Sequence, residues 1–356
     1  MPSTNDKILA VPTNIITGFL GVGKTSAILH LLKQKPTHER WAILVNEFGE
    51  IGVDGSLFQG QSTQAQSAEE PAERTQRVFI KEVPGGCMCC ASGLPMQIAL
   101  NLLLNEAKPD RLLIEPTGLG HPVEVLQLLS NQYYSEILDL QKTITLVDAR
   151  NLADNRYTAH ATFNQQISIA DMVVGNKVDL YSEVHEKALN TYLVHLKAPD
   201  APEQQLVFTE HGKIELAWLA GKTAHLPVKH RHHHHNHHGQ NKRKNEPIAA
   251  EKPLPASGYL TAVNQGEGFN SVGWRFAPDK IFDREQLLIF LTGITAERIK
   301  GVFITSDGIF GYNSTRDGLT EIALDECLES RIEIICANNE VETQQWEQTL
   351  TAALVC

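Results

Sequence analysis

The sequence predicts an α/β fold, in which a mostly parallel sheet covered by helices on both faces is followed by a small α+β domain. Two patterns predict it. Short apolar segments near residues 15, 43, 80, 113, 145, 173 and 207 alternate with helical stretches, as in parallel sheets whose ligand loops lie at the carboxyl ends of the strands. Beyond residue 256 the pattern changes to short strands over 258–263, 271–276, 301–305, 309–313 and 331–336, with helices over 284–292 and 341–355.

Between these regions lies a segment that cannot form a core. Seven of the ten residues 229–238 are histidine, and such a tract is expected to stay disordered. We therefore expect a first domain over 1–225, a disordered linker over 226–256 and a second domain over 257–356. Inside the first domain, residues 59–77 contain hardly any apolar side chains and are predicted to form a mobile insertion.

The first strand leads into a glycine-rich turn. Gly18 and Gly23 are separated by four residues, Lys24 and Thr25 follow, and a strand and a helix flank the turn. Glycines let successive backbone N–H groups point at an anion, and the helix N-terminus adds positive charge. Here Lys24 is expected to reach the β- and γ-phosphates of a nucleoside triphosphate and the Thr25 hydroxyl to ligate Mg²⁺, so the first domain is predicted to be a P-loop NTPase domain. The predicted nucleotide contacts in this P-loop are Gly18, Gly21, Val22, Gly23, Lys24, Thr25 and Ser26.

A second motif predicts which base the bound nucleotide carries. Asn176-Lys177-Val178-Asp179 follows a strand over 171–175. Guanine offers an N1–H and an exocyclic amine that the Asp179 carboxylate can accept together, whereas adenine does not, and a site built around such a bond rejects the analogue that lacks it. Asn176 is expected near the other edge of the base and the Lys177 stem over the ring, so the predicted nucleotide is GTP. Residues 209–212 are a further candidate loop beside the base.

A third element lies between these motifs. The strand over 111–114 ends in Glu115, and Gly118 follows three residues later. A carboxylate at this strand end can hold Mg²⁺ through water, and the Gly118 backbone can approach the γ-phosphate. Lys24 and Glu115 are therefore the predicted catalytic residues; the alternative for Glu115 is a surface acid at a strand terminus. Asp148, at the end of another strand, is expected to face the nucleotide side.

Three of the six cysteines, Cys87, Cys89 and Cys90, fall within four residues. A disulfide between adjacent cysteines would be strained, whereas clustered thiolates favour Zn²⁺ or Cu(I) over hard cations. The alternatives are a redox-sensing pair or inert buried cysteines. The fourth ligand of a tetrahedral site is left open between His121, Glu47, Glu50 and water.

The histidine tract is a second candidate metal site. Most of its imidazoles are uncharged near neutral pH and are able to coordinate metal. The tract therefore either buffers or senses metal, or is a solvated linker. Its histidines are His230, His232, His233, His234, His235, His237 and His238.

Taken in order, these motifs resemble one protein family. The P-loop, residues 46–55, the cysteine run, Glu115-Pro116-Thr117-Gly118 and the Asn-Lys-Val-Asp motif follow the order of the CobW-type branch of P-loop GTPases, relatives of the HypB and UreG nickel-insertion proteins. The chain is most similar to the zinc-binding YeiR-type members. The tail resembles the CobW C-terminal domain around Arg298-Ile299-Lys300-Gly301, so the resemblance covers the whole chain. The branch also carries Glu at the position of Glu115, whereas the 59–77 insertion is longer than usual for it.

The resemblance implies weak GTP hydrolysis, Zn²⁺ binding at Cys87, Cys89 and Cys90, and delivery of the metal to a client metalloprotein. We therefore expect a metal-loaded switch with GTP, Mg²⁺ and Zn²⁺ as cofactors. Residues 46–55 are the candidate nucleotide-sensing segment. No arginine finger or water-positioning glutamine is identifiable in the sequence, so slow intrinsic turnover is expected. Within the sensing segment, the candidate contacts to Mg²⁺, the attacking water or the zinc are Glu47, Glu50 and Asp54.

Three other functions stay open at this point. The chain could store or buffer zinc, with nucleotide only stabilising its fold. It could insert cobalt or nickel instead of zinc, because the general order of affinities among divalent metals does not identify the metal that a site binds in the cell. It could also be a regulatory GTPase whose cysteines sense redox state.

Length, charge and composition limit the number of domains, the partners and the location that can be expected. The length of 356 residues suffices for two domains, and the net charge of −11 argues against a nucleic-acid partner, for which a basic chain is expected. Neither a signal peptide before residue 13 nor a run of about 18 apolar residues is found, so no membrane partner is expected. Six cysteines without a regular framework fit the cytoplasm. The second domain is expected to dock a partner or to form homo-oligomers.

Overall fold

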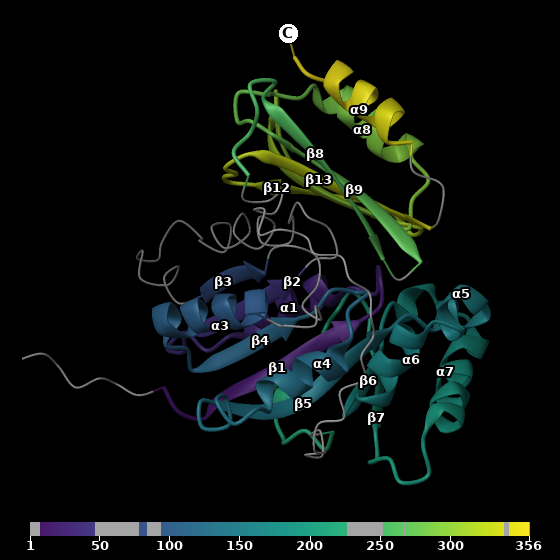
Figure 1. The fold of residues 1–356 in the computed structure, drawn as a ribbon. Coiled ribbons are helices and arrows are strands. Elements are labelled where there is room, and N and C mark those ends of the chain that lie inside the picture. The colour runs from purple at the N-terminus through teal and green to yellow at the C-terminus, as the bar shows by residue number, and fades with distance from the viewer. Residues whose placement is uncertain are drawn as a thin grey trace, which may run out of the picture.

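The computed structural model describes residues 8–46, 78–83, 94–225, 252–266, 268–337 and 342–355. These residues form two sheets, each with its own helices, and the six-stranded sheet lies over one edge of the seven-stranded sheet (Figure 1). The expected insertion, the cysteine run and the histidine tract lie outside the described residues. The expected domain boundaries around residues 225 and 257 stay predictions.

The N-terminal sheet has the strand order β3-β2-β4-β1-β5-β6-β7, and the pairings between its described strands are parallel. The apolar segments found in the sequence are its strands, which confirms the predicted α/β class. The strands are β1 (Val11–Gly18), β2 (Trp41–Asn46), β3 (Val78–Val83), β4 (Arg111–Glu115), β5 (Leu138–Val147), β6 (Met172–Gly175) and β7 (Gln205–Phe208).

Helices cover both faces of this sheet. The longest of the described helices have 14 residues, and none combines the length and the apolar character that crossing a membrane requires. The α-helices are α1 (Lys24–Gln34), α3 (Leu94–Ala107), α4 (Pro122–Leu129), α5 (Asn155–Thr158), α6 (Ala161–Ser168) and α7 (Glu183–Leu196). Three short 3₁₀ turns follow β5, β6 and β7, namely η2 (Ala149–Ala153), η3 (Val178–Leu180) and η4 (Leu216–Leu219).

The alternation of side chains along β1 shows how the two cores arise. Ile15 and Ile16 are neighbours in sequence and both are buried, yet they belong to different core clusters because successive strand residues point to opposite faces. The Ile16 cluster includes apolar residues of α1, α6 and α7, and the Ile15 cluster includes those of α3 and α4. A strand buried on both faces therefore has adjacent apolar residues such as Ile15 and Ile16 and no strict alternation of apolar and polar ones.

The C-terminal domain is an antiparallel sheet with two helices, which confirms the predicted small α+β domain. Its strand order is β12-β11-β10-β13-β9-β8. The strands are β8 (Tyr259–Gly266), β9 (Phe269–Phe276), β10 (Arg298–Thr305), β11 (Gly308–Thr315), β12 (Gly318–Leu324) and β13 (Ser330–Ala337), and the helices are α8 (Arg284–Gly293) and α9 (Thr343–Ala352).

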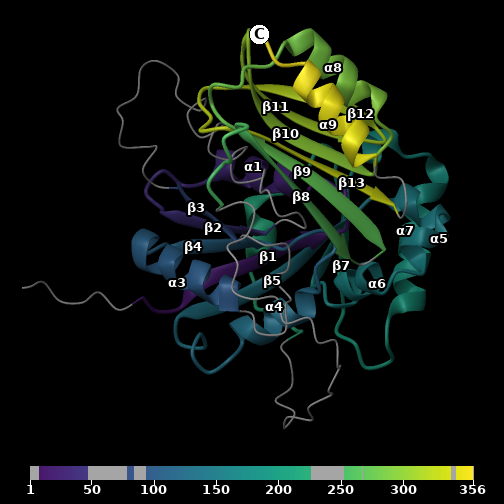
Figure 2. The ribbon, with the colours of Figure 1, turned by 45° about the horizontal axis from the view of Figure 1, so that its top comes forward.

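The two faces of this second sheet differ. Ile299 and Phe303 of β10 belong to the apolar cluster that includes residues of α8 and α9. Arg298 and Lys300 alternate with them, so they point to the opposite face. In Figure 1, and again in the turned view of Figure 2, α8 and α9 lie on the side of the sheet that is away from the parallel sheet. The polar face of β10 is therefore turned toward the N-terminal domain.

A buried carboxylate ties the end of the N-terminal domain to its sheet. Asp171 is 7% exposed and accepts hydrogen bonds from the Thr143 N–H at 2.8 Å and from the Ala224 N–H at 2.7 Å. Bonds from N–H groups to a charged acceptor are stronger than neutral ones, and leaving the donors unsatisfied would cost more.

We therefore expect Asp171→Asn to lower the free energy of unfolding by about 2 kcal/mol, because an amide presents an N–H₂ group to one of the two backbone donors. Urea denaturation followed by tryptophan fluorescence would measure this. Asp200→Asn, at an exposed carboxylate, is the control and should leave stability unchanged. Equal stability of the two variants would show that the Asp171 contacts contribute little.

Candidate nucleotide site

The turn between β1 and α1 has the backbone of an anion-binding loop. Gly23 precedes α1 in a left-handed conformation, with a φ of 98°. A Cβ atom at this position would lie 2.6 Å from the Asn176 side-chain nitrogen, so only glycine fits. The first N–H groups of α1 have no acceptor within the helix and carry the positive end of its dipole. The loop therefore has a backbone suited to an anion, and phosphate binding here stays a prediction.

Lys24 lies folded over this loop. Its side chain is 5% exposed, and its Nζ atom donates to the carbonyl oxygens of Gly18 at 3.0 Å and Phe19 at 3.1 Å. Gly118 comes close to the same ammonium group, because a Cβ atom built on it would lie 3.2 Å from Lys24 Nζ. The P-loop and the turn after β4 therefore meet at Lys24.

Thr25 and Glu115 meet beside Lys24. The Thr25 hydroxyl donates to Glu115 Oε1 at 3.1 Å, and Glu115 is 2% exposed, so the alternative of a surface acid is wrong. Gln166 holds the following turn by donating to the Gly118 carbonyl oxygen at 3.0 Å. A hydroxyl and a carboxylate are the hard oxygen ligands that Mg²⁺ prefers, so this pair fits the predicted metal.

Asn176 joins the P-loop to a second loop. Its side-chain N–H₂ group donates to the Val22 carbonyl oxygen at 2.8 Å, and its Oδ1 accepts from the Gly212 N–H at 3.0 Å. The predicted base-binding residues 176–179 and the candidate loop 209–212 are thus held together. Asp179 lies exposed in the turn η3 and lines the same cavity as the P-loop.

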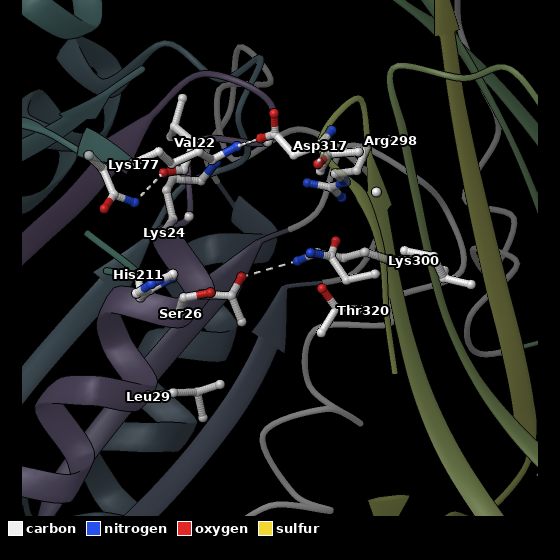
Figure 3. Close-up of a pocket in the computed structure, with 18 of the residues that line it drawn as sticks. Val22, Lys24, Ser26, Leu29, Lys177, His211, Arg298, Lys300, Asp317 and Thr320 are labelled. Carbon is white, nitrogen blue, oxygen red and sulfur yellow. Dashed lines mark hydrogen bonds and ion pairs between the residues drawn. The ribbon is translucent and has the colours of Figure 1, made fainter. Parts of the chain in front are cut away.

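These elements surround one cavity of about 430 Å³ (Figure 3). The described lining includes residues 21–26 of the P-loop, Glu115, Asn176, Lys177 and Asp179, all predicted from sequence. Each lies at or just after the carboxyl end of a parallel strand, the edge at which such sheets bind ligands. The opposite wall comes from the C-terminal domain, which the sequence did not place in the site. Its contributions include Arg298, Lys300, Asp317 and Thr320.

Two side chains of the C-terminal domain contact predicted site residues directly. The Lys300 ammonium donates to Thr25 Oγ1 at 3.1 Å. Asp317, in the turn between β11 and β12, accepts from Lys177 at 2.6 Å and from both terminal nitrogens of Arg150 at 2.7 and 2.9 Å. The Arg150 hydrogen bonds, and then those of Lys177, hold the pKa of Asp317 well below its usual range. Asp317 is therefore ionised at neutral pH.

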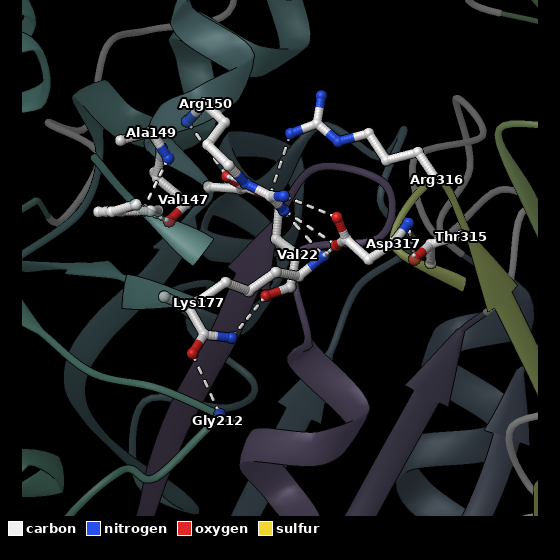
Figure 4. A network of polar contacts seen from close by, with 12 residues as sticks. Val22, Val147, Ala149, Arg150, Lys177, Gly212, Thr315, Arg316 and Asp317 are labelled. Atoms are coloured by element: carbon white, nitrogen blue, oxygen red, sulfur yellow. Dashed lines mark hydrogen bonds and ion pairs between the residues drawn. The ribbon is translucent and has the colours of Figure 1, made fainter. Parts of the chain in front are cut away.

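Asp148 does not line the described cavity, contrary to the expectation that it faces the nucleotide. It accepts from Arg150 Nη2 at 2.6 Å and from Arg316 Nη2 at 3.3 Å (Figure 4). The reason is local, because η2 begins directly after Asp148 and brings the Arg150 backbone and side chain back onto its carboxylate. Asp148 belongs to the polar contact between the domains.

A small cluster lies at the base end of the cavity. Ligand atoms of Asp179, Glu210 and His211 lie within 4.8 Å of one another. Lys213 holds the pKa of Glu210 below its usual value through a hydrogen bond. Asp179 of this cluster is the residue predicted to contact the base.

The structure does not describe the predicted zinc-binding cysteines. Cys87, Cys89 and Cys90 lie outside the described residues, as do Glu47, Glu50, Asp54 and the histidines of the 229–238 tract. His121, one candidate for the fourth ligand, precedes α4, and its Nδ1 lies 3.3 Å from Gln165 Oε1. The zinc site stays a prediction.

A sequence signal for the missed wall exists in β10. Arg298 and Lys300 alternate with Ile299, so a half-buried strand must point both cations to one face. In a half-buried strand such a face can lie in water, so the sequence does not show that another surface covers it.

This chain is similar to several known proteins. A family model described as CobW/HypB/UreG, nucleotide-binding domain, matches residues 12–201. Zinc chaperone YeiR of Escherichia coli (strain K12) is 39% identical over 332 residues, 92% of this chain and 93% of that protein. Zinc chaperone YjiA of the same strain is 30% identical over 216 residues, 59% of this chain and 60% of that protein. The crystal structure of the Zn(II)-bound YjiA GTPase aligns with 97% of this chain and 99% of that one, at 18% identity and a TM-score of 0.41.

The family match covers more than half of the chain and the YeiR match nearly all of it. Both confirm the resemblance that the order of the motifs indicates. The chain belongs to the CobW/HypB/UreG family of P-loop GTPases.

Proposed function

We propose that this GTPase binds GTP with Mg²⁺ in the cavity between its domains and couples hydrolysis to the delivery of Zn²⁺ to a client metalloprotein. The observation that carries the nucleotide part is the convergence of the P-loop, Glu115 and residues 176–179 on one cavity. The zinc part is supported by YeiR, which is named a zinc chaperone and matches 92% of this chain, and by the three clustered cysteines.

At the phosphate end, each group has a distinct task. The N–H groups at the start of α1 and the Lys24 ammonium would bind the β- and γ-phosphates. Thr25 and Glu115, already 3.1 Å apart, would hold Mg²⁺, which supplies neutralisation of charge on the phosphates. Because Glu115 is buried at the end of β4, its position is fixed by the sheet.

At the base end, Asp179 would accept the two guanine N–H donors. Asn176 supports this loop through its bonds to Val22 and Gly212, so its role is to position the base-binding segment against the P-loop. The Lys177 stem would cover one face of the ring.

Zinc would be held by Cys87, Cys89 and Cys90. A reducing cytoplasm, the proposed location, would keep these cysteines available as thiolate ligands. The cluster is followed closely by α3, whose buried Leu100 and Leu103 pack in the sheet core, and then by β4, which carries Glu115. In this proposal, loss of the γ-phosphate at the Glu115 end changes the geometry of the zinc ligands. The histidine tract would buffer metal.

The base assignment is tested by Asp179→Asn. An amide offers one acceptor and one donor, which suits the N1–H and 2-oxo groups of xanthine but not the two donors of guanine. We expect the affinity for GTP relative to XTP to fall on the order of 100-fold, as measured by competition with a fluorescent nucleotide. Asp200→Asn should leave the ratio unchanged. An unchanged ratio in the Asp179 variant would mean that this carboxylate does not read the base.

The zinc assignment is tested by Cys89→Ser. Loss of one thiolate ligand should weaken zinc binding by at least about 10-fold, measured by competition with a chromophoric chelator, and leave GTP affinity nearly unchanged. Cys327→Ser is the matched control, because this thiol lies in the C-terminal domain and donates to the Glu329 carbonyl oxygen. Parallel loss of zinc and GTP binding in Cys89→Ser would instead point to a role in folding.

The coupling is tested by measuring zinc affinity in the GDP state and with a non-hydrolysable GTP analogue. We expect affinities that differ about 10-fold, equivalent to ~1.4 kcal/mol, and by linkage zinc must shift nucleotide affinity by the same factor. Equal affinities in the two states would contradict a GTP-gated carrier and favour zinc storage.

A further inference from the structure

We propose that Asp317 of the C-terminal domain positions Lys177 at the base end of the nucleotide site, so that nucleotide affinity depends on a residue outside the N-terminal domain. The inference rests on the proposed function, because it requires the Lys177 stem to cover one face of the base. It adds to that function a positioning residue that the nucleotide-binding motifs of the sequence do not contain.

The first argument is the place of Asp317 in the fold. Thr315 and Gly318 form the last pair between β11 and β12, so Arg316 and Asp317 are the loop of a tight hairpin. A two-residue loop between paired strands adopts few conformations. Asp317 and Lys177 both line the cavity, and the hairpin therefore holds the Asp317 carboxylate at the end where the base is predicted to lie.

The second argument is the contact between the two residues. The Lys177 ammonium donates to Asp317 Oδ2 at 2.6 Å and lies 3.7 Å from Asp148 Oδ2 of its own domain (Figure 4). The C-terminal domain thus supplies the nearer of these two carboxylates. The side chains of Lys177 and Asp317 are 18% and 20% exposed, so water and salt screen this pair less than they screen a pair on the open surface.

The third argument is that Asp317 is itself held in place. Both terminal nitrogens of Arg150 donate to its carboxylate, at 2.7 and 2.9 Å, which makes a bidentate pair with a fixed orientation. Arg150 Nη2 also donates to the buried Asp148 at 2.6 Å, so one guanidinium bridges carboxylates of both domains. Arg150 therefore fixes the orientation in which Asp317 meets Lys177.

These contacts bear on the base because a lysine stem is flexible. Ordering a free lysine side chain when a ligand binds costs conformational entropy. The bond to Asp317 holds only the ammonium, so the aliphatic stem stays available to the ring. Part of the ordering is then complete before the nucleotide arrives, which favours binding.

A second charge pair between the domains provides a matched control. Arg156 donates to Glu297 at 2.6 Å, and neither residue is part of the described lining of the cavity. Glu297→Gln therefore weakens a polar contact between the domains without touching Lys177. It separates the positioning of Lys177 from a general effect of domain docking.

The test is a double-mutant cycle on the full-length protein with Mg²⁺ present. Calorimetry measures GDP affinity for the wild type, Asp317→Ser, Lys177→Met and the variant with both changes. We expect each single change to weaken GDP binding about 5-fold, and the double variant to bind no more weakly, because both changes remove the same contact. Asp317→Glu, which keeps the charge, should restore most of the affinity. Glu297→Gln should leave GDP affinity unchanged.

Asp317→Asn covers the case in which Asp317→Ser fails to fold, because asparagine suits a turn and also removes the charge. A loss that persists when Lys177 is already methionine would show that Asp317 does not act through Lys177, and would overturn the inference. An equal loss in Glu297→Gln, or no loss in either Asp317 variant, would overturn it as well. If the wild type binds no GDP, the proposed function fails, and this inference fails with it.

Discussion

The P-loop is packed between two domains, and the docking of the C-terminal sheet onto it shapes the whole site. The ring of Phe19, the second residue of the loop, lies 6.0 Å from the ring of Phe269 at the start of β9, and both belong to the same buried cluster. At the other end of the loop, Thr25 contacts Lys300. One short segment therefore carries both an apolar and a polar contact between the domains, so a ligand that changes the P-loop must also act on the interface.

Charged side chains of the two domains pair along this interface. At the base end, Asp317 of the C-terminal domain is paired with Lys177 and Arg150. Next to them, Arg316 of the C-terminal domain donates to Asp148. Each domain supplies charged side chains that pair with side chains of the other domain. The walls of the cavity come from both domains, so neither domain alone forms it.

The sequence predicts the parts of the site that are local in the chain. Adjacent apolar residues such as Ile15 and Ile16 identify a strand buried on both faces, and a P-loop needs only one strand, one turn and one helix. The contact between Thr25 and Lys300 spans 275 residues, and no local pattern shows which face of one domain packs on another. The strand β12 was missed for a related reason. It is an edge strand whose side chains are mostly exposed or half-buried, and its pairing with β11 forms it.

The two faces of β10 connect the cavity to the core of the C-terminal domain. Arg298 and Lys300 face the cavity, while Ile299 and Phe303 between and beyond them are fully packed in the core that includes residues of α8 and α9. Because close-packed cores do not deform locally, a displacement of the cations shifts the sheet and its helices as one body. Around the cavity the contact between domains is largely polar, so its strength depends on the charges present.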